Sequence, residues 1–466
     1  MNKKGFTLME IIVVIALLGA IMLLVVPNIT KNFKDSKKRL FYDNVVSLYT
    51  SAGRSFLLLD NPSNKTFSNS GNTLDVDVSE DITYKIVVNS YGEVTSMYVT
   101  NGTYSYSKSN SNGIKKKDIK LDDIIEGTGG EDASAKVTLF DKLLEDNPTI
   151  QTRSSFNTVF TTTNTGTLYK ATESIAGSAA KDVYYFAGDA KNNWVKFANF
   201  YWRIIRTNAD GSIRLLYSGT SPDTTEGYIG TSTFNTTSNS PKYAGYMYGD
   251  TDATLEEART NTNNSTIKTA IDNWYENNLT SYTNYLSNDA IYCNDRELVG
   301  GINAYYNSDK GNFEFMSYQR LYVSNNDTSA RPTYDCTNTK DAFSVNNTET
   351  KLTYPIGLMT ADEISYAGGL AYTDLTSPYA WYYLNSAGGS ITGTELWWSL
   401  SPGIWRDNRA YLSRVAGSDN PGYLYLGNVG NSHGVRPVIS LKSCIKYSTG
   451  NGSAENPYEI EMNGGC

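Results

Sequence analysis

The stretch MNKKGFTLMEIIVVIALLGAIMLLVVPNITKNF, residues 1–33, decides how the rest of the chain is organised. In the apolar run that follows the first five residues, the only polar side chains are those of Thr7 and Glu10. A helix of this length, rising about 1.5 Å per residue, spans roughly 30 Å, which is the thickness of one bilayer core. The sequence therefore predicts a transmembrane helix over residues 6–28.

A short basic leader, residues 1–5, precedes the apolar run, and secretory signal peptides begin in the same way. Two features argue against such a signal: the apolar run is longer than the usual one, and Val25-Val26-Pro27 does not supply a small-residue cleavage site. Glu10 is more informative, because a carboxylate inside an apolar helix costs several kcal/mol unless it is paired. The alternative to a functional, paired Glu10 is a plain membrane anchor in which the glutamate is incidental.

The order of residues in this segment resembles the leader and first helix of type IV pilins and pseudopilins. Lys-Lys-Gly5 is followed by Phe6-Thr7-Leu8-Met9-Glu10 and by an apolar helix with Pro27 near its end. The resemblance covers residues 1–60. It implies that a prepilin peptidase cuts after Gly5 and that Phe6 becomes an N-methylated terminus. It also implies that Glu10 neutralises the terminal amine of a neighbouring subunit during assembly.

The same resemblance implies the partners and the location of the protein. The partners are the prepilin peptidase, other pilin subunits and, before assembly, membrane lipid. The chain is expected to cross the cell membrane once, with its N-terminus cytoplasmic and its bulk extracellular, and to reach a pilus or the cell surface after assembly. The positive-inside rule does not settle this orientation, because basic residues also follow the anchor directly: Lys31, Lys34, Lys37, Lys38 and Arg39. We therefore take the orientation from the leader motif.

Residues 29–126 are predicted to form a pilin-like helix and a small antiparallel β-meander. Pro27 is expected to kink the helix. Beyond it, an amphipathic stripe recurs mostly at three- and four-residue steps: Phe33, Phe41, Val45, Leu48, Ala52 and Phe56. The predicted strands and their hairpin turn are Ile82–Val88, Val94–Thr100, Asn101-Gly102 and Thr103–Ser107.

The composition indicates a polar, β-rich protein outside the first helix. Of 466 residues, 36 are Tyr and 38 are Gly, and the mean hydropathy is −0.41. Abundant Tyr, Thr, Asn and Ser favour strands joined by turns over helical packing. The net charge of −8 and the pI near 5.0 argue against nucleic acid as a partner.

Glycine and acidic residues at 127–132 predict a domain boundary. Residues 127–167 are assigned to a linker with a short helix, and residues 168–466 to a large second domain. The predicted fold class is α+β, with a long N-terminal transmembrane and amphipathic helix, a small antiparallel sheet and a large, mixed, β-rich domain.

The second domain is predicted to consist of short strands with a few helices. Thr360, with Glu363 three residues later, predicts a helix that begins with a capping box. An amphipathic helix is predicted at Thr266–Leu279. The predicted strands are Val183–Phe186, Trp194–Thr207, Ile213–Tyr217, Trp397–Ser401, Ala410–Val415, Gly422–Val429 and Val435–Leu441.

Four segments of the second domain resemble a widespread bacterial surface module. They are FYWRIIRTNADGSIRLLYSG, IGLMTADEISYAGG, ELWWSLSPG and HGVRPVISLK. The core of this module is similar to the C-type-lectin-like fold, which formylglycine-generating enzymes also use. In related modules, the stretch between the Trp-rich strand and the GVRP strand faces the ligand, and in this chain that stretch is Ile404–His433.

The stretch Ile404–His433 has the composition of an adaptable binding surface. Tyr and Trp provide large rigid contacts, whereas Asn and Ser provide hydrogen bonds. The ligand, a protein or a glycan, is predicted to contact Trp405, Arg406, Asp407, Asn408, Arg409, Tyr411, Arg414, Asp419, Asn420, Tyr423, Tyr425, Asn428 and Asn431.

The four cysteines permit two disulfides in an exported chain, with three possible connectivities. We favour Cys293–Cys336 and Cys444–Cys466, because each pair closes a loop within one region. Free thiols are the alternative.

The sequence predicts no catalytic site, no metal site and no cofactor. His433 is the only histidine, which excludes a cluster of histidine metal ligands, and a structural role is expected for it. No HExxH, CxxC or phosphate-binding loop occurs. Asp250 and Asp252 could hold calcium, but a solvated loop is the simpler interpretation. The cysteine pair of formylglycine-generating enzymes is not matched, because Cys444 and Cys466 lie outside the matching segments.

Three further side chains are expected to be structural or partly structural. Trp397 and Trp398 point to opposite faces of one strand, so one is expected in the core and the other could reach the surface. Both could also be structural. Arg436 is expected to form a buried ion pair or to fix a loop.

The leading hypothesis is a minor pilin-like subunit that displays a large adhesive head at the cell surface or pilus tip. A head of this size is hard to repeat at every position of a packed filament. The alternatives are a membrane-anchored surface enzyme on the same fold, or a pseudopilin of a secretion or DNA-uptake apparatus. The absence of a catalytic constellation argues against the enzyme.

Glu10→Val is expected to leave membrane insertion intact and to reduce incorporation into filaments, because valine cannot neutralise a neighbour's terminal amine. The amounts of the protein in membranes and in sheared pili measure the two effects. Normal incorporation in sheared pili would count against the pairing.

Overall fold

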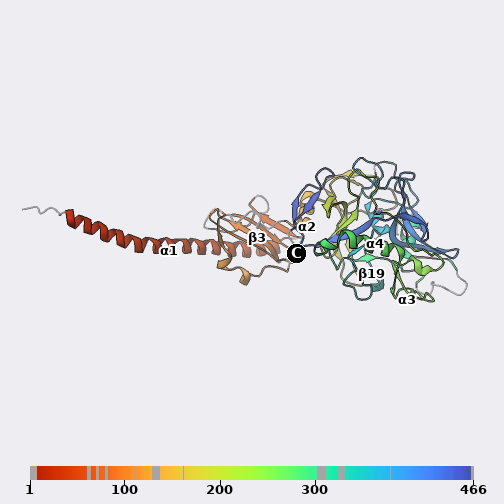
Figure 1. The fold of residues 1–466 in the computed structure, drawn as a ribbon, viewed down its shortest axis with the longest axis horizontal. Helices are drawn as coiled ribbons and strands as arrows, with labels where there is room; N and C mark the ends of the chain where they lie inside the picture. Colours follow the sequence, from red (N-terminus) through yellow and green to blue (C-terminus); the bar gives the residue numbers. More distant parts are fainter. Residues whose placement is uncertain are drawn as a thin grey trace, which may run out of the picture. The chain divides into compact units, whose positions relative to one another are not determined.

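The structure, a computed structural model, describes residues 8–59, 64–69, 73–78, 82–110, 112–127, 137–160, 162–301, 311–323, 331–377 and 379–462. Within residues 8–32 it describes the backbone, and side chains only at Met9 and Val13. The chain divides into two compact units, which we call unit 1 (Met1–Lys136) and unit 2 (Val137–Cys466). Figure 1 shows both units, and each is described by itself below.

Unit 1 is built on one long helix, α1 (Leu8–Leu57), which continues through Pro27. Tyr49 and Tyr42 help to hold the helix, because their hydroxyls donate hydrogen bonds to the carbonyls of Ile114 (2.8 Å) and Ile119 (3.3 Å). The predicted apolar stripe is buried from its second member onward: Phe41, Val45, Leu48, Ala52 and Phe56.

Phe33, the first member of the predicted stripe, is 65% exposed, so the stripe is shorter than predicted. At about 100° per residue, eight residues place Phe33 about 80° from Phe41 around the helix. Phe33 therefore does not share the face that the sheet covers. Among the residues that the structure describes, no helix is long and apolar enough to cross a membrane. The predicted span at residues 6–28 lies largely outside the described side chains.

An antiparallel sheet covers the buried face of α1 (Figure 1). Its strands follow one another along the chain and pair in that order: β1 (Lys65–Ser68), β2 (Thr83–Val88), β3 (Val94–Thr100), β4 (Tyr104–Ser109) and β5 (Ile125–Glu126). The predicted hairpin between β3 and β4 is confirmed, with Gly102 at a φ of +80° that L-residues rarely adopt. Two 3₁₀ turns, η1 (Lys116–Asp118) and η2 (Leu121–Asp123), precede β5.

Unit 2 begins within the segment that the sequence assigned to a linker. Helix α2 (Leu139–Asp146) buries Leu139 and Leu143 in the core of unit 2. The next strand, β6 (Thr149–Gln151), pairs in parallel with β8 (Thr167–Glu173). The predicted linker at 127–167 therefore overlaps the start of unit 2.

A ten-stranded sheet forms one layer of unit 2. Its main path runs β20 (Ile356–Leu358), β25 (Pro437–Leu441), β13 (Ile213–Tyr217), β12 (Phe200–Thr207), β11 (Trp194–Phe197), β27 (Tyr458–Ile460) and β26 (Tyr447–Thr449). Strands β6, β8 and β9 (Lys181–Tyr185) branch from this path, because β9 pairs with both β8 and β12.

A six-stranded sheet forms the second layer. Its path is β14 (Thr231–Thr233), β24 (Ser432–Gly434), β21 (Trp397–Arg406), β22 (Arg409–Val415) and β23 (Leu424–Asn428), and β18 (Phe313–Glu314) pairs with β21. Strand β21 is longer than predicted.

Short elements connect these layers. The helices are α3 (Leu255–Ala258), α4 (Thr266–Asn278), α5 (Met316–Tyr318), α6 (Ala361–Ala367), the 3₁₀ helices η4 (Pro241–Ala244), η5 (Thr280–Tyr285) and η9 (Thr339–Asp341), and the π-helix η7 (Gln319–Val323). The two-residue strands outside the two large sheets are β7 (Thr163–Asn164), β10 (Asp189–Ala190), β15 (Met247–Tyr248), β16 (Asn263–Asn264), β17 (Tyr292–Cys293) and β19 (Ala342–Phe343).

Two local predictions in unit 2 differ in outcome. The capping box of α6 is confirmed, because Glu363 N donates to Thr360 Oγ1 and Thr360 N donates to Glu363 Oε2. The single predicted strand at Trp194–Thr207 is wrong, since it is the β11–β12 hairpin. Its turn residues, Ala198 and Asn199, adopt φ values of +53° and +65°.

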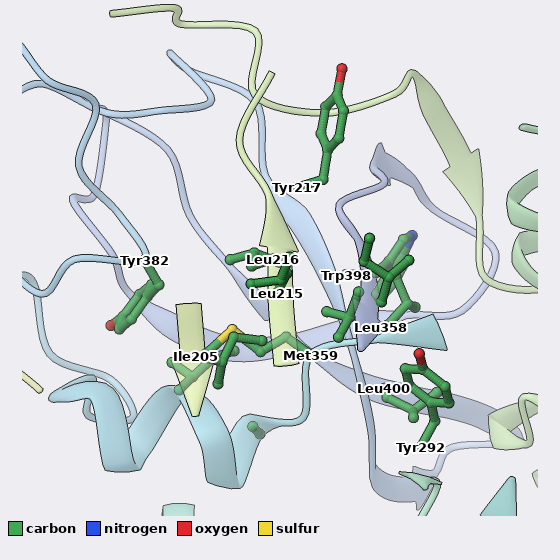
Figure 2. Packing of buried hydrophobic residues seen from close by; sticks show 14 of the residues in the cluster. Ile205, Leu215, Leu216, Tyr217, Tyr292, Leu358, Met359, Tyr382, Trp398 and Leu400 are labelled. Carbon is green, nitrogen blue, oxygen red and sulfur yellow. The ribbon is translucent and has the colours of Figure 1, made fainter. Parts of the chain in front are cut away.

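The core of unit 2 lies where the two large sheets and α6 meet. Figure 2 shows side chains from β12, β13, β20 and β21 packed together, among them those of Ile205, Leu215 and Leu358. Trp397 and Trp398 are both fully buried, so neither reaches the surface. Trp398 instead donates its indole N–H to the carbonyl of Ser232 at 2.9 Å.

Two buried arginines join distant segments of this core. Arg436 donates to the carbonyls of Tyr382 (2.6 Å) and Tyr217 (3.0 Å) and stacks 4.8 Å above the Trp397 ring. Arg203 donates to the carbonyls of Ala190 and Leu384. Arg436 thus fixes loops, as predicted, and it does so through carbonyl groups.

Arg436→Lys is expected to lower the free energy of unfolding of unit 2 by about 2–4 kcal/mol, because an ammonium cannot reproduce the planar fork and leaves buried carbonyls unpaired. All seven tryptophans lie in unit 2, so tryptophan fluorescence during urea unfolding measures this change. The exposed Arg409→Lys is the matched control, expected within about 0.5 kcal/mol of wild type. Equal stability of the two variants would contradict the role given to Arg436.

Candidate functional site

The predicted processing and assembly residues lie at the start of the chain. Gly5 and Phe6 are outside the described residues. Glu10 and Pro27 lie on α1, and the structure does not describe their side chains. The functional side chains that the structure does place are therefore those of unit 2.

The predicted ligand stretch, Ile404–His433, contributes several strands to the six-stranded sheet, including its edge strand β23. It comprises the end of β21, all of β22 and β23, and the start of β24. Asp407 and Asn408 make the β21–β22 turn with φ values of +52° and +57°, as a two-residue hairpin turn requires.

The thirteen predicted contact residues differ in exposure. Trp405 is 2% exposed, and this prediction is corrected: its side chain packs in the core, where β21 pairs with β18 and β22. The exposed members are Arg406, Asp407, Asn408, Arg409, Asp419, Asn420 and Asn431. The half-buried members are Tyr411, Arg414, Tyr423, Tyr425 and Asn428.

The half-buried members do not form one surface. Tyr411 pairs with Asn428, and Arg414 pairs with Tyr425, in the antiparallel ladder of β22 and β23. Successive side chains of a strand alternate between faces, so these two pairs, three residues apart, lie on opposite faces of the sheet. Only the pair Arg414 and Tyr425 continues into a larger cluster.

That cluster is a continuous row of five tyrosines, which we call the tyrosine strip: Tyr318, Tyr322, Tyr372, Tyr423 and Tyr425. Ring centroids are 5.1 Å apart for Tyr318–Tyr322, 5.3 Å for Tyr322–Tyr372, 6.1 Å for Tyr372–Tyr423 and 5.2 Å for Tyr423–Tyr425. Such spacings are those of interacting aromatic pairs. The strip joins α5, η7, the segment after α6 and β23, which are far apart in sequence.

Tyr372 is the most exposed member of the strip, at 48%. Its backbone N–H donates to the carbonyl of Leu424 at 2.9 Å, and its φ is +54°, in the left-handed region that bulky residues avoid. Burial, followed by the neighbouring Tyr318, raises the pKa of Tyr372 to about 12, so its hydroxyl stays protonated at neutral pH. Backbone strain at an exposed aromatic residue is a feature of binding sites.

Arg414 closes one end of the strip. Its guanidinium lies 4.3 Å above the Tyr425 ring, and its Nη1 contacts His433 Nε2. Burial lowers the pKa of Arg414, and burial together with the Arg414 charge lowers the pKa of His433 to about 4. His433 is therefore neutral at pH 7, with Nε2 as the acceptor.

Three members of this cluster, Arg414, Tyr423 and Tyr425, were predicted from the sequence, whereas the other three tyrosines were not. Tyr318 and Tyr322 are four residues apart, a helical spacing that could have indicated a shared face. Nothing local to Tyr372 indicates its neighbours, because the strip exists only once the six-stranded sheet has formed.

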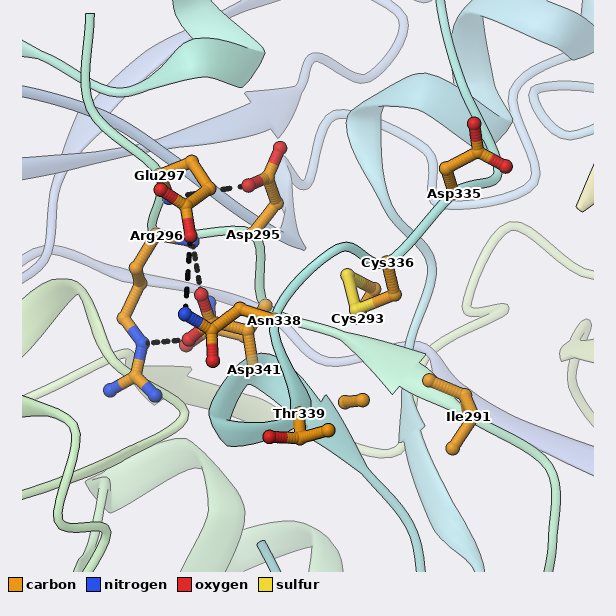
Figure 3. The surroundings of a disulfide bond; sticks show 12 residues. Ile291, Cys293, Asp295, Arg296, Glu297, Asp335, Cys336, Asn338, Thr339 and Asp341 are labelled. Carbon is orange, nitrogen blue, oxygen red and sulfur yellow. Dashed lines mark hydrogen bonds and ion pairs between the residues drawn. A yellow bond between two sulfur atoms is a disulfide. The ribbon is translucent and has the colours of Figure 1, made fainter. Parts of the chain in front are cut away.

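A second cluster of charged side chains surrounds the disulfide in Figure 3. The predicted pair Cys293–Cys336 is confirmed and closes a loop of 43 residues. Cys444 also forms a disulfide, and Cys466, its predicted partner, lies outside the described residues. Beside Cys293, Asp341 accepts from Arg296 (2.6 Å) and Arg259 (2.8 Å).

Both cysteines of this disulfide line a cavity of about 20 Å³. Charged groups from several elements line it and pair with one another: Arg206 with Glu173 (2.9 Å) and Glu363 (3.0 Å), and Arg320 with Asp362 (3.0 Å). This volume accommodates about one water molecule. The charged side chains therefore form a network of ion pairs, and the cavity that they line is too small to admit an organic ligand.

Within the described part of the chain, no group of three or more His, Cys, Asp or Glu side chains could hold a metal ion. Asp250 is exposed and accepts a hydrogen bond from Asn263 at 2.7 Å, whereas Asp252 accepts one from Ser240.

Comparisons with known proteins identify the start of the chain. Residues 1–26 match the family described as the prokaryotic N-terminal methylation motif. No curated protein and no solved structure matches the chain. The motif indicates a type IV pilin-like or pseudopilin protein, with processing by a prepilin peptidase and assembly with other pilins. The lectin-like assignment of residues 168–466 stays a prediction.

The stability of unit 2 is expected to fall by about 2 kcal/mol between pH 7 and pH 5 because of His433. Its folded-state pKa of about 4 lies below the ordinary value, so the unfolded chain binds the proton first as the pH falls. Since His433 is the only histidine, His433→Gln removes this contribution, and urea unfolding at several pH values compares the two proteins. Identical pH profiles would contradict the lowered pKa.

Proposed function

We propose that the protein is a pilin-like minor subunit that displays unit 2 as a ligand-binding head at the cell surface or at a pilus tip. The N-terminal methylation motif supports the pilin-like part. Unit 1 supports it further, since a single long helix lies under a small antiparallel sheet. In this proposal the apolar start of α1 anchors the subunit in the membrane and then in the filament.

The relative size of the two units supports a minor, terminal position. Unit 2 is more than twice as long as unit 1. A head of that size at every position of a helical filament would have to be accommodated between closely packed subunits. At a tip it has space on all sides.

The tyrosine strip is the observation that carries the ligand-binding part of the proposal. Its rings are in mutual contact, which limits their conformational freedom before a ligand arrives. Tyrosine offers a large rigid surface and a hydroxyl at low entropic cost, which is why binding surfaces are enriched in it. The opposite face, with Tyr411 and Asn428, shows no comparable row among the described residues.

Tyr372→Ser combined with Tyr423→Ser is expected to reduce attachment of cells that display the protein by about tenfold or more, because two central contacts of the strip are lost. Attachment is measured on a printed panel of proteins and glycans, with surface amounts of the protein checked by immunoblot. Tyr91→Ser is the matched control, since Tyr91 is 75% exposed on unit 1 and outside the strip.

Unchanged attachment of the double variant to every surface that wild-type cells bind would contradict the proposal. Loss of the protein from the surface would instead mean that the variant fails to fold. In that case the single variant Tyr372→Phe, which keeps the ring and removes only the hydroxyl, is measured in the same attachment assay. Its surface amount reports on folding, and its attachment reports on binding.

A further inference from the structure

We propose that four basic side chains near the start of unit 1 bind anionic lipid headgroups before the subunit enters a filament. We call these side chains the basic collar: Lys34, Lys37, Lys38 and Arg39. This assignment rests on the proposed function, in which the apolar start of α1 anchors the subunit, and it specifies the lipid that surrounds the anchor. The charge of the collar, its height on α1, its distribution around α1 and an exposed ring beside it support the assignment.

Positive charge is concentrated directly after the apolar start of the chain. Residues 31–39 contain five Lys and Arg and a single acidic residue, Asp35, although the whole protein carries a net charge of −8. Lys34 pairs with Glu126 at 3.5 Å, and the two side chains are 63% and 66% exposed. Within the described residues, the other three members of the collar form no ion pair. Because exposed ion pairs contribute little, the charge of the collar is available to an anionic partner.

The collar lies just beyond the predicted membrane span. Helix α1 continues through Pro27, so the collar follows residues 6–28 along one helix. At 1.5 Å per residue, its members lie about 9–17 Å beyond residue 28, and the adjoining headgroup layer is about 5–8 Å thick. Helical side chains tilt toward the N-terminus of the helix, and the long stems of Lys and Arg let their charges reach a nearby polar layer. The collar is therefore within reach of the headgroups.

The members of the collar surround α1 instead of sharing one face. At about 100° per residue, Lys38 and Arg39 follow Lys34 by about 40° and 140° around the helix. Lys37 lies about 60° from Lys34 in the opposite direction, so the collar spans about 200° of the circumference. A protein partner that packs against α1 would contact one side of it, whereas headgroups surround a membrane helix. The distribution therefore favours a lipid surface.

Phe33 adds an exposed aromatic ring directly before the collar. Its side chain is 65% exposed, and the sheet of unit 1 does not cover it. The sheet reaches α1 at the next residue, where the Tyr104 hydroxyl donates to the carbonyl of Lys34 at 3.2 Å. Phenylalanine beside Lys and Arg is typical of helices that lie at a membrane interface. The headgroup layer thus accounts for both the exposed ring and the basic side chains that follow it.

The first test uses the full chain in vesicles of phosphatidylcholine, with or without added phosphatidylglycerol. A membrane-impermeant reagent acetylates exposed lysines, and peptide mass spectrometry measures the rates at Lys37 and Lys38 relative to Lys181 of unit 2. We expect both rates to fall about threefold or more in the anionic vesicles, because the headgroups hold the ammonium groups. The rates should recover in salt of about 1 M, where the Debye length is about 3 Å.

Two controls separate a lipid surface from other causes of protection. Soluble glycerol 3-phosphate, added to phosphatidylcholine vesicles at the same phosphate concentration, is expected to leave the rates unchanged. Lys116 is exposed on η1, which lies beside Tyr42 and Tyr49 of α1 and so beyond the collar. Its rate should therefore change less than those of Lys37 and Lys38.

The second test removes three charges of the collar, by Lys37→Ser, Lys38→Ser and Arg39→Ser together. In mixed micelles of both lipids, we expect the wild-type chain to retain phosphatidylglycerol over phosphatidylcholine about threefold or more, and the triple variant to show no preference. Mass spectrometry of the retained lipids measures this ratio. The matched control removes three exposed charges of unit 1 outside the collar and should keep the preference: Lys115→Ser, Lys116→Ser and Lys117→Ser.

Equal acetylation rates in the two kinds of vesicle would overturn the inference, as would a preference that both triple variants lose equally. Protection by soluble glycerol 3-phosphate would assign the collar to a free phosphate and overturn it as well. So would protection in phosphatidylcholine alone that rises with protein density, which would assign the collar to a second copy of the chain. In each case the chain stays in the vesicles and the proposed function stands. A chain that washes out of both kinds of vesicle would instead contradict the anchor and the proposed function with it.

Discussion

The structure of unit 2 depends on satisfying two buried guanidinium groups, those of Arg203 and Arg436. Neither forms an ion pair within the described chain, and burial lowers the pKa of each to about 9, so both stay charged at neutral pH. A buried charge without acceptors would destabilise the folded state by more than the free energy of unfolding of a typical domain. The fold therefore has to bring carbonyl groups from residues 190, 217, 227, 382 and 384 to these two side chains.

The hydrogen bonds of Arg436 also help to fix the candidate site. Arg436 follows β24 by two residues, and β24 pairs with both β14 and β21. Fixing Arg436 therefore fixes the strand that carries His433, which contacts Arg414 at the end of the tyrosine strip. The rings of the strip, of which Tyr372 is exposed and Tyr322 is buried, are consequently supported by a buried scaffold, and a ligand would meet a surface that is already ordered. Such preorganisation reduces the entropic cost of binding.

Features set by neighbouring residues could be predicted from the sequence. The buried stripe from Phe41 to Phe56, the capping box of α6 and the strand Ile213–Tyr217 follow from periodicity or from fixed short spacings. The hairpin at Ala198-Asn199 was missed because alanine seldom adopts a positive φ, so nothing in its identity indicates a turn.

The candidate site could be predicted only in part. Composition identified the stretch Ile404–His433, yet the burial of Trp405 and the division of Tyr411 and Arg414 between two faces depend on strand register. The remaining tyrosines of the strip come from segments about 50 to 110 residues away in sequence, which only the paired sheet brings together.

In the proposed function, a pilin-like N-terminus carries a head with a preorganised binding surface, so processing of the N-terminus is the first requirement. Mass spectrometry of the N-terminal peptide, from protein isolated from the cell surface, measures it. We expect a peptide that begins at an N-methylated Phe6. A peptide that retains Met1 to Gly5, or one that begins beyond Val26, would contradict it.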